Sequence, residues 1–359
     1  MITQMQVERN DLTTSRLVTR ETPALVEGQV LARVDSFALT ANNVTYGVAG
    51  DMIGYWKFFP AEGDWGIIPV WGFATVMQSR CPDIPVGERI WGFLPMASHV
   101  VLEPGQVARG AFVDGAAHRQ ALPGLYNRYQ RTAGEPAELA ALEVERCALF
   151  PLFTTSYVIT EMLADNDWFG AKQVLVLSAS SKTGFGLANM LSRVEGRPVK
   201  VIGVTSAANR TFVEGLGVCD RTITYDEITQ LDPAVPSIVV DMAGSTPILT
   251  AVHTHFGDAL VYSCGVGITH WTDRGPPAEL PGAKPAFFFA PGQIAKREAD
   301  WGPGEILRRA QAEGARIARE VAGAITVERI SGAEAARSAL AEMVAGKVSP
   351  RRVLMLSIA

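Results

Sequence analysis

Residues 174–186 read VLVLSASSKTGFG, and this stretch decides the fold. Its first four residues are aliphatic without polar alternation, which predicts a short parallel strand buried on both faces. Small residues then form a turn, and apolar residues at positions 187, 188, 190 and 191 follow at helical spacing. A second apolar run covers residues 199–204. Together these segments predict a βαβ unit, whose helix N-terminus is suited to the pyrophosphate of a dinucleotide.

The turn departs from the usual glycine-rich sequence. Ser178 and Ser181 stand where glycines are commoner, while Gly184 and Gly186 remain. One alternative is a strand, turn and helix that bind no ligand. Another is a P-loop, suggested by residues 181–183 (SKT), although the glycines of G-x-x-x-x-G-K-[ST] are missing. We expect the cofactor phosphates to contact the residues of this turn, namely Ser180, Ser181, Lys182, Thr183 and Gly184.

The end of the second predicted strand indicates which dinucleotide binds. An acidic residue about 20 positions beyond the turn would bind the ribose 2′-hydroxyl of NAD. No Asp or Glu occurs between Arg197 and Arg210, and the chain instead supplies Ser206, Asn209 and Arg210. Since Arg can hold a phosphate through two hydrogen bonds, the pattern favours NADP(H) over NAD(H). The alternative is that Ser206 caps a helix and Arg210 is an ordinary solvated residue.

The composition limits the class of protein. At 359 residues the chain is longer than a single core usually allows, so two domains are expected. Hydrophobic residues make up 48% and charged residues 19%, which is typical of a well-buried enzyme. A net charge of -5 gives no electrostatic case for nucleic acid. No apolar run is long enough for a membrane span, the N-terminus lacks the pattern of a signal peptide, and the four cysteines show no paired spacing, so a cytoplasmic location is expected.

The pattern of residues changes near position 150. The preceding part contains short strand-like pieces broken by Gly and Pro, which predict an antiparallel, barrel-like domain. These pieces are residues 29–34, 67–77, 88–94 and 99–102. Beyond position 150 helices alternate with buried strands, as in a doubly wound parallel sheet. The predicted division is 1–150 for the first domain, 151–300 for the cofactor domain, and 301–359 for C-terminal helices and a strand that return to the first domain.

Four further segments occur in a specific order along the chain. They are residues 28–34 (GQVLARV), 84–92 (IPVGERIWG), 155–157 (TSY), and the pair 346–348 and 352–354 (GKV and RVL). In this order they resemble the opening strand, the "vGDrVyG" segment, the "TAY" entry and the C-terminal "GKvVL" of the medium-chain dehydrogenase/reductase superfamily. The resemblance spans nearly the whole chain and is greatest to the zinc-independent quinone-reductase-like and enoyl-reductase-like members. The serine-lysine-threonine turn is similar to that of one branch, DUF2855.

This resemblance implies an α/β fold, in which a Rossmann doubly wound parallel sheet is combined with a GroES-like, mostly-β domain closed by the C-terminal strand. It implies binding of NADP(H) and a homodimer formed through the edge strand near residues 285–290. Four more residues join the expected cofactor-binding set, namely Thr155, Tyr225, Gly244 and Gly265.

The sequence departs from the zinc-dependent members of that superfamily. Those members carry an early Cys and a "GHE" segment, but here residues 39–46 read LTANNVTY and residues 71–74 read WGFA. Tetrahedral zinc needs thiolate, imidazole or carboxylate ligands, and these segments supply none. We therefore expect no metal.

Without a metal, hydrogen-bond donors must stabilise charge on a substrate oxygen. The resemblance implies that the segment around Asn43, Thr45 and Tyr46 lines the active site, and Tyr46 is the best proton donor because a phenol donates at neutral pH. A core role for Tyr46 is an equal alternative. The function expected is NADPH-dependent hydride transfer to or from a small apolar carbonyl or activated alkene. The alternative is a catalytically inactive protein that binds or senses NADP(H).

Overall fold

The computed structural model describes residues 1–267 and 279–358. The chain divides into two compact units, Met1–Ala148 with Ile325–Ala359, and Leu149–Ala324. The sequence-based division gave residues 301–359 to a separate C-terminal part. In the structure, helix α10 (Glu305–Val321) belongs to the second unit because it packs along α5 (Phe150–Asp165).

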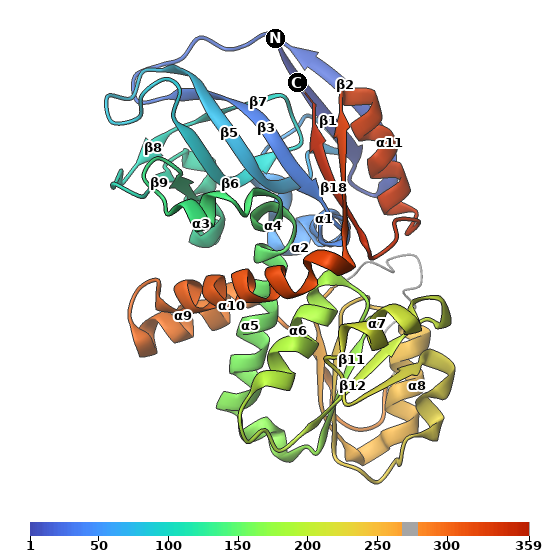
Figure 1. Cartoon of the computed structure of the whole chain (residues 1–359). Coiled ribbons are helices and arrows are strands. Elements are labelled where there is room, and N and C mark those ends of the chain that lie inside the picture. The colour runs from blue at the N-terminus through green and yellow to red at the C-terminus, as the bar shows by residue number, and fades with distance from the viewer. Residues whose placement is uncertain (268–278, 359) are drawn as a thin grey trace. The chain divides into compact units, whose positions relative to one another are not determined.

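The first unit is built mainly of antiparallel strands (Figure 1). A three-stranded sheet has the order β2-β1-β4, and a nine-stranded sheet has the order β17-β18-β3-β5-β6-β10-β9-β8, with β7 also paired to β3. The strands are β1 Ile2–Glu8, β2 Asp11–Arg20, β3 Val30–Leu39, β4 Trp65–Gly66, β5 Pro69–Ser79, β6 Arg89–Pro95, β7 His99–Leu102, β8 Pro104–Gly105, β9 Ala111–Asp114, β10 Arg128–Arg131, β17 Thr326–Ser331 and β18 Arg352–Ser357. The C-terminal strand β18 pairs with β3, so the end of the chain completes the sheet that the N-terminal part begins.

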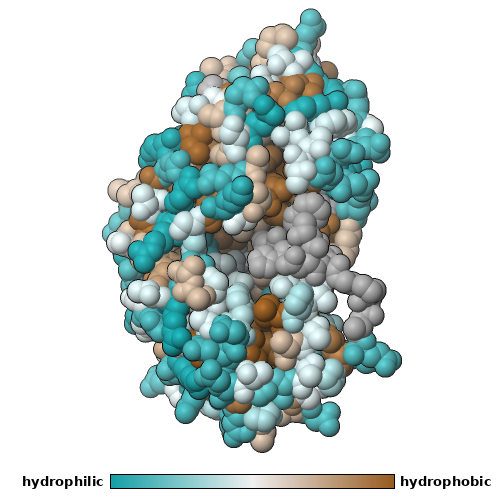
Figure 2. Space-filling view, turned by 90° about the vertical axis from the view of Figure 1, so that its right-hand side faces the viewer, coloured by the Kyte–Doolittle hydropathy of each residue, from teal (hydrophilic) through white to brown (hydrophobic). Residues whose placement is uncertain are grey.

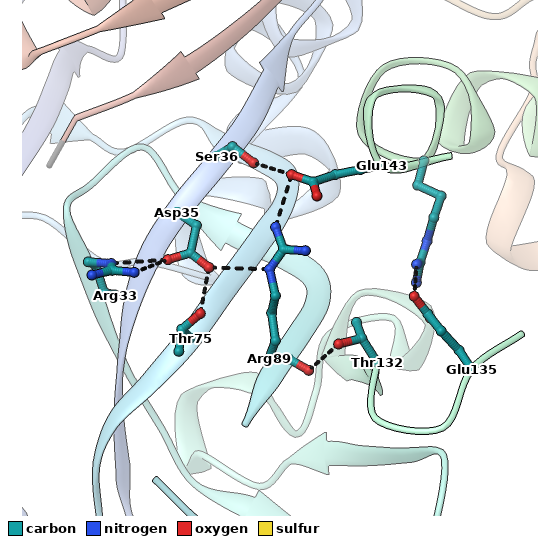
Figure 3. A network of polar contacts seen from close by, with 9 residues as sticks. Arg33, Asp35, Ser36, Thr75, Arg89, Thr132, Glu135 and Glu143 are labelled. Carbon is teal, nitrogen blue, oxygen red and sulfur yellow. Dashed lines mark hydrogen bonds and ion pairs between the residues drawn. The ribbon is translucent and has the colours of Figure 1, made fainter. Parts of the chain in front are cut away.

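The α-helices of this unit are short except for α1 and α11. They are α1 Ala41–Val48, α2 Gly50–Ile53, α3 Ala137–Ala140, α4 Glu143–Ala148 and α11 Ala333–Val344. Charged side chains tie α4 to its surroundings (Figure 3). Glu143 accepts a hydrogen bond from Ser36 (3.2 Å) and pairs with Arg89 (2.9 Å). The buried Arg146 pairs with Glu135 (2.7 Å), so both ends of α4 are held by ion pairs.

The second unit contains one parallel sheet of six strands in the order β13-β12-β11-β14-β15-β16. This order is the doubly wound one that the sequence predicts, and the fold class is confirmed. The strands are β11 Gln173–Leu177, β12 Lys200–Thr205, β13 Arg221–Thr224, β14 Ser237–Asp241, β15 Leu260–Gly265 and β16 Pro285–Phe287. The helices around them are α5, α6 Lys182–Arg193, α7 Arg210–Leu216, α8 Thr246–Phe256, α9 Ala290–Trp301 and α10. Every residue of β11 and β14 is buried, as expected for the centre of a sheet covered on both faces.

Some elements differ from the sequence-based expectation. The sequence pattern predicts a helix over residues 162–169, but α5 ends at Asp165, because residues 167–169 all adopt positive φ and cannot continue it. The last strand of the parallel sheet covers Pro285–Phe287 only, and α9 begins at Ala290. Strands β1, β2 and β17 were not predicted. The last of these is largely exposed, so its apolar pattern is weak.

None of the helices within the described residues has the length and apolar character needed to cross a bilayer. On the face drawn in Figure 2, apolar residues lie in small separate patches among hydrophilic ones. Such scattered apolar residues are ordinary for a protein surface.

Candidate functional site

The candidate cofactor site lies where the chain leaves β11, β12 and β13. These three strands are neighbours and run parallel, so their carboxyl ends share one edge of the sheet. Ligands of doubly wound sheets bind outside that edge. The residues predicted from the turn after β11 and from the end of β12 are therefore brought together.

The turn after β11 reaches the usual geometry without the usual glycines. Ser178 adopts a φ of 54°, a left-handed conformation that non-glycine residues rarely take. Its carbonyl accepts a hydrogen bond from the Ser181 amide (2.8 Å), and the Ser181 hydroxyl accepts one from the Gly184 amide (3.1 Å), which caps α6. A Cβ atom on Gly184 would lie only 2.4 Å from the Ser178 carbonyl oxygen. Gly184 is thus needed for the close approach of helix and turn.

Two hydrogen bonds between hydroxyl groups link this turn to the neighbouring strand ends. Ser178 and Tyr225 share one across 2.9 Å, and Thr205 donates to Ser180 across 3.1 Å. Ser180 and Thr205 are buried, whereas Tyr225 is partly buried at the start of the short helical turn after β13. The structure therefore joins two predicted cofactor residues, Ser180 and Tyr225, to one cluster of hydroxyl groups.

Lys182 is the first residue of α6, and Thr183 follows it. Burial lowers the pKa of the Lys182 ammonium group to about 8. A cation at a helix N-terminus is disfavoured by the helix dipole as well, and the first backbone N–H groups of the helix lack acceptors within it. An anion bound at this end would relieve both effects. The arrangement is therefore suited to phosphate groups.

Arg210, at the start of α7, is held by two carboxylates. Its Nε donates to Glu214 (2.9 Å), and its Nη1 donates to both carboxylate oxygens of Glu227 (3.0 and 3.1 Å). Ser206 lies just before it, and the Ser206 hydroxyl makes no hydrogen bond to other described residues. Asn209 is partly buried and precedes α7 in the N-cap position. The Arg210 side chain is 40% exposed, so its guanidinium is solvated as well as ion-paired to two carboxylates.

Sequence reasoning missed Glu214 and Glu227. Two local signals point to them. Arg210 and Glu214 are four residues apart on one helix, a spacing that brings side chains together. Thr224 and Glu227 form a capping box, in which Glu227 accepts the Thr224 amide (2.9 Å). Neither signal indicates that Glu214 and Glu227 would both bind the guanidinium of Arg210.

The remaining predicted cofactor residues occupy separate places. The Thr155 hydroxyl bonds to the Pro151 carbonyl within α5, whereas its neighbour Ser156 donates to the Thr183 carbonyl (2.9 Å) and so contacts the start of α6. The Gly244 amide donates to the Asp241 carboxylate (3.1 Å), which shapes the turn after β14. Gly265 ends β15, and its carbonyl accepts the Phe288 amide.

The predicted catalytic residues lie in α1 of the first unit, and Tyr46 is the centre of an aromatic cluster. Its hydroxyl oxygen accepts a hydrogen bond from the Trp71 indole N–H (3.2 Å), and its ring centroid lies 4.5 Å from that of Tyr55. Tyr55 and Tyr126 share a hydrogen bond between their hydroxyl groups (3.0 Å). Burial raises the pKa of Tyr46 well above its ordinary value, so the phenol keeps its proton at neutral pH.

Asn43 has a structural function that the sequence did not reveal. Its side-chain oxygen accepts the Thr40 amide (2.7 Å), and its amide nitrogen donates to the Pro69 carbonyl (2.9 Å). Asn43 therefore caps α1 and ties it to β5, and both ends of its side chain are engaged. Thr45 is buried in the same helix.

Among the residues that the structure describes, no group of three or more His, Cys, Asp or Glu side chains is placed to hold a metal ion. Four cysteines are present as free thiols.

Comparisons with known proteins were made for the whole chain. The family model described as "Protein of unknown function (DUF2855)" matches residues 37–349. No curated protein matches the sequence.

Several solved structures have a similar fold at low sequence identity. CurA from Vibrio vulnificus, in complex with NADPH, has a TM-score of 0.62 at 13% identity, and the alignment covers 99% of each chain. A quinone oxidoreductase from Pseudomonas syringae pv. Tomato has a TM-score of 0.55 at 16% identity, covering 99% of each chain. The yhdH oxidoreductase from Salmonella enterica, in complex with NADP, has a TM-score of 0.51 at 16% identity, covering 100% of each chain.

Proposed function

Since the chain belongs to the DUF2855 family and has the two-part fold of these oxidoreductases, we propose that it is an NADP(H)-dependent oxidoreductase. The reaction proposed is hydride transfer to or from a small apolar carbonyl compound or activated alkene. A fold by itself serves many functions, so the proposal depends on the residues of the site.

The observation that carries the proposal is the cluster at the carboxyl ends of β11, β12 and β13. There a partly buried lysine at a helix N-terminus shares one edge of the sheet with an ion-paired guanidinium. Two hydrogen bonds between hydroxyl groups join the three strand ends. A dinucleotide presents a negatively charged pyrophosphate and an adenosine ribose with hydroxyl groups. The hydrogen-bond donors at this sheet edge suit both.

The residues of each strand end have separate tasks in this proposal. The turn at residues 180–184, with Lys182, would hold the pyrophosphate. Ser206, Asn209 and Arg210 would face the adenosine ribose, with Tyr225 beside it. Thr155 in α5, with Gly244 after β14 and Gly265 at the end of β15, completes the proposed set. When bound, the nicotinamide cofactor supplies or accepts the hydride.

Tyr46 is proposed as the group that stabilises negative charge on the substrate oxygen. Its protonated phenol accepts from Trp71 and has the Asn42 side chain within hydrogen-bonding reach, and the O–H is proposed to donate to the substrate oxygen. Asn43 and Thr45 are proposed to support it by fixing α1. The substrate is apolar in this proposal because the side chains around Tyr46 are aromatic.

Zinc is not required in this proposal, because residues 39–46 and 71–74 contain no Cys, His, Asp or Glu. Purified protein dialysed against a chelator should keep its fold and bind the cofactor. Stoichiometric zinc found by elemental analysis would overturn this part of the proposal.

We further propose a cytoplasmic homodimer that forms through β16. This strand pairs with β15 on one side, and all three of its residues are exposed. Phe287 is 45% exposed and Phe289 is 40% exposed, so the edge carries large apolar side chains. An unprotected apolar edge strand tends to pair with another chain. A monomer in light scattering at micromolar concentration would contradict the dimer.

The function is tested first by binding and then by turnover. Titration with NADPH and NADH, followed by fluorescence, should show saturable binding, and a panel of quinones, enals and ketones should reveal oxidation of NADPH. Binding without turnover of any substrate would favour the second candidate, an inactive protein that binds or senses NADP(H). Absence of binding to either cofactor would reject both.

A further inference from the structure

We propose that Glu214 and Glu227 determine the cofactor preference of this protein by offsetting the charge of Arg210. In this proposal, the adenosine-ribose site discriminates only narrowly between a 2′-phosphate and a 2′-hydroxyl group. The inference rests on the proposed function, because it assumes that Arg210 faces the ribose of a bound dinucleotide.

The hydrogen bonds of Arg210 leave little of its guanidinium for a ligand. A guanidinium presents two edges for bidentate binding, Nε with Nη2 and Nη1 with Nη2. Here Nε is bonded to Glu214 and Nη1 to Glu227, so each edge has one nitrogen already engaged. Within the described residues only Nη2 has no partner. A 2′-phosphate would therefore meet one nitrogen, or would have to displace a carboxylate.

Glu227 is the harder of the two carboxylates to displace. The Oε2 atom that contacts Arg210 also accepts the amide of Thr224 (2.9 Å), as part of the capping box after β13. Its side chain is 24% exposed, compared with 49% for Glu214. Glu227 is thus fixed to the sheet edge, and its position does not depend on Arg210 alone.

The charges around Arg210 do not balance. The Thr224 amide and the Arg210 guanidinium hold the pKa of Glu227 below its usual range. Two carboxylates, those of Glu214 and Glu227, therefore contact one guanidinium, with a local charge of about -1 at neutral pH. This charge repels the dianion of a 2′-phosphate, whereas a carboxylate can accept a hydrogen bond from a 2′-hydroxyl.

The test uses isosteric variants that remove one charge each. Glu214→Gln and Glu227→Gln keep a side-chain oxygen that can accept from Arg210. Glu195→Gln is the matched control, because this exposed residue lies between α6 and β12, at the opposite edge of the sheet. Dissociation constants for NADPH and NADH are measured for all four proteins, including the unsubstituted chain, at low and high salt.

For the unsubstituted chain, the two affinities should differ by roughly tenfold or less. Each of the two charge-removing variants should raise the NADPH affinity by roughly threefold to tenfold and leave the NADH affinity unchanged or lower it. These gains should shrink at high salt, because the site is exposed and the effect is a screened repulsion. The control variant should change neither affinity.

Two results would overturn the inference while leaving the proposed function intact. One is a preference for NADPH of several hundredfold in the unsubstituted chain. The other is an unchanged ratio of the two affinities in Glu214→Gln, which removes an exposed charge without touching the capping box. If neither cofactor bound the unsubstituted chain, the proposed function itself would fail. A loss of both affinities in Glu227→Gln alone, with Glu214→Gln behaving as expected, would assign Glu227 a structural task and confine the inference to Glu214.

Discussion

The hydroxyl groups of Ser178 and Tyr225 lie 2.9 Å apart and join the turn after β11 to the end of β13. The two residues directly follow β11 and β13, which are not neighbours, because β12 lies between these strands. Ser178 makes this contact while its backbone is in a left-handed conformation, with a φ of 54°. The left-handed backbone of Ser178, which is unfavourable for a serine, therefore occurs at the residue that contacts Tyr225 across the proposed cofactor site.

Replacing Arg210 by Ala should weaken NADPH binding and leave NADH binding nearly unchanged. Charge-assisted hydrogen bonds contribute about 1.5–3 kcal/mol, and we expect the lower end, about 1.5 kcal/mol, because two carboxylates already offset the guanidinium. Arg221→Ala is the control, since this exposed residue lies at the other end of the neighbouring strand β13. Equal losses of affinity for NADPH and NADH would contradict a contact between Arg210 and the 2′-phosphate.

The affinity for NADPH should fall as the pH rises through about 8, where Lys182 loses its proton in the free protein. Bound phosphates favour the charged lysine, so binding above this pH takes up a proton. The stability of the free protein should change in the opposite direction. The pKa of Lys182 is lowered by folding, so the unfolded chain binds more protons above pH 8, and this residue adds stability as the pH rises toward about 10.4.

Titrations between about pH 7 and about pH 9.5 check both trends. Lys182→Met removes the charge and retains much of the apolar stem, so its NADPH affinity should be lower at pH 7 and nearly constant over this range. A variant with unaltered affinity at every pH would show that Lys182 is solvated and does not contact the phosphates.

Gly184→Ala should destabilise the protein and abolish cofactor binding. The new Cβ would lie 2.4 Å from the Ser178 carbonyl oxygen, so the turn or the helix must move. Overpacking of this kind typically costs about 1–3 kcal/mol. Gly215→Ala, within α7, has nothing within 4 Å of the new atom and should stabilise the protein slightly, by up to about 1 kcal/mol. Thermal unfolding of both variants measures the contrast, and a stable Gly184→Ala that binds NADPH would contradict the geometry.

The parallel sheet could be predicted from the sequence because its central strands are continuous aliphatic runs. Residues 174–177 and 238–240 are wholly buried, as these runs indicate. The edges were harder to predict. In β17 most residues are exposed and charged or small, so no periodicity marks the strand, and its place beside β18 depends on pairing with a distant segment.

The sequence predicted which residues lie at the ends of the parallel strands, but not which other side chains they contact. Ser180, Ser206 and Arg210 were expected from their places at strand ends, and Tyr225 was added to the cofactor-binding set with the family resemblance. That Glu227 would meet Arg210 depends on the pairing of β12 with β13, which local spacing does not reveal. Asn43 was expected as a donor to substrate, yet its side chain caps α1, because a capping residue and a catalytic amide look alike in sequence.

Removal of the Asp114 charge should be strongly destabilising. Asp114 and Arg119 form an ion pair of 2.8 Å, with side chains only 1% and 2% exposed, and Arg119 also donates to Tyr129 (2.9 Å). Asp114→Asn would leave a buried guanidinium without its counter-charge, which typically costs about 3–5 kcal/mol. Glu334→Gln breaks the exposed pair with Arg337 and should change stability by less than about 1 kcal/mol. Denaturant unfolding of the two variants measures the difference.

Tyr46→Phe should lower the rate of hydride transfer about 10²–10³-fold while barely changing cofactor affinity. The phenol is the proposed donor to the substrate oxygen, and its oxygen already accepts from Trp71, which orients the remaining O–H away from the indole. The variant keeps the ring, so the contacts with Tyr55 and Phe93 are retained and packing loss does not confuse the result. Tyr55→Phe is the matched control, because the Tyr55 hydroxyl bonds only to Tyr126 in the described structure. We expect single-turnover rates to separate the two variants. If Tyr46→Phe retained full turnover on the best substrate of the panel, Tyr46 would be a core residue, and the proton would have to come from water or from the substrate.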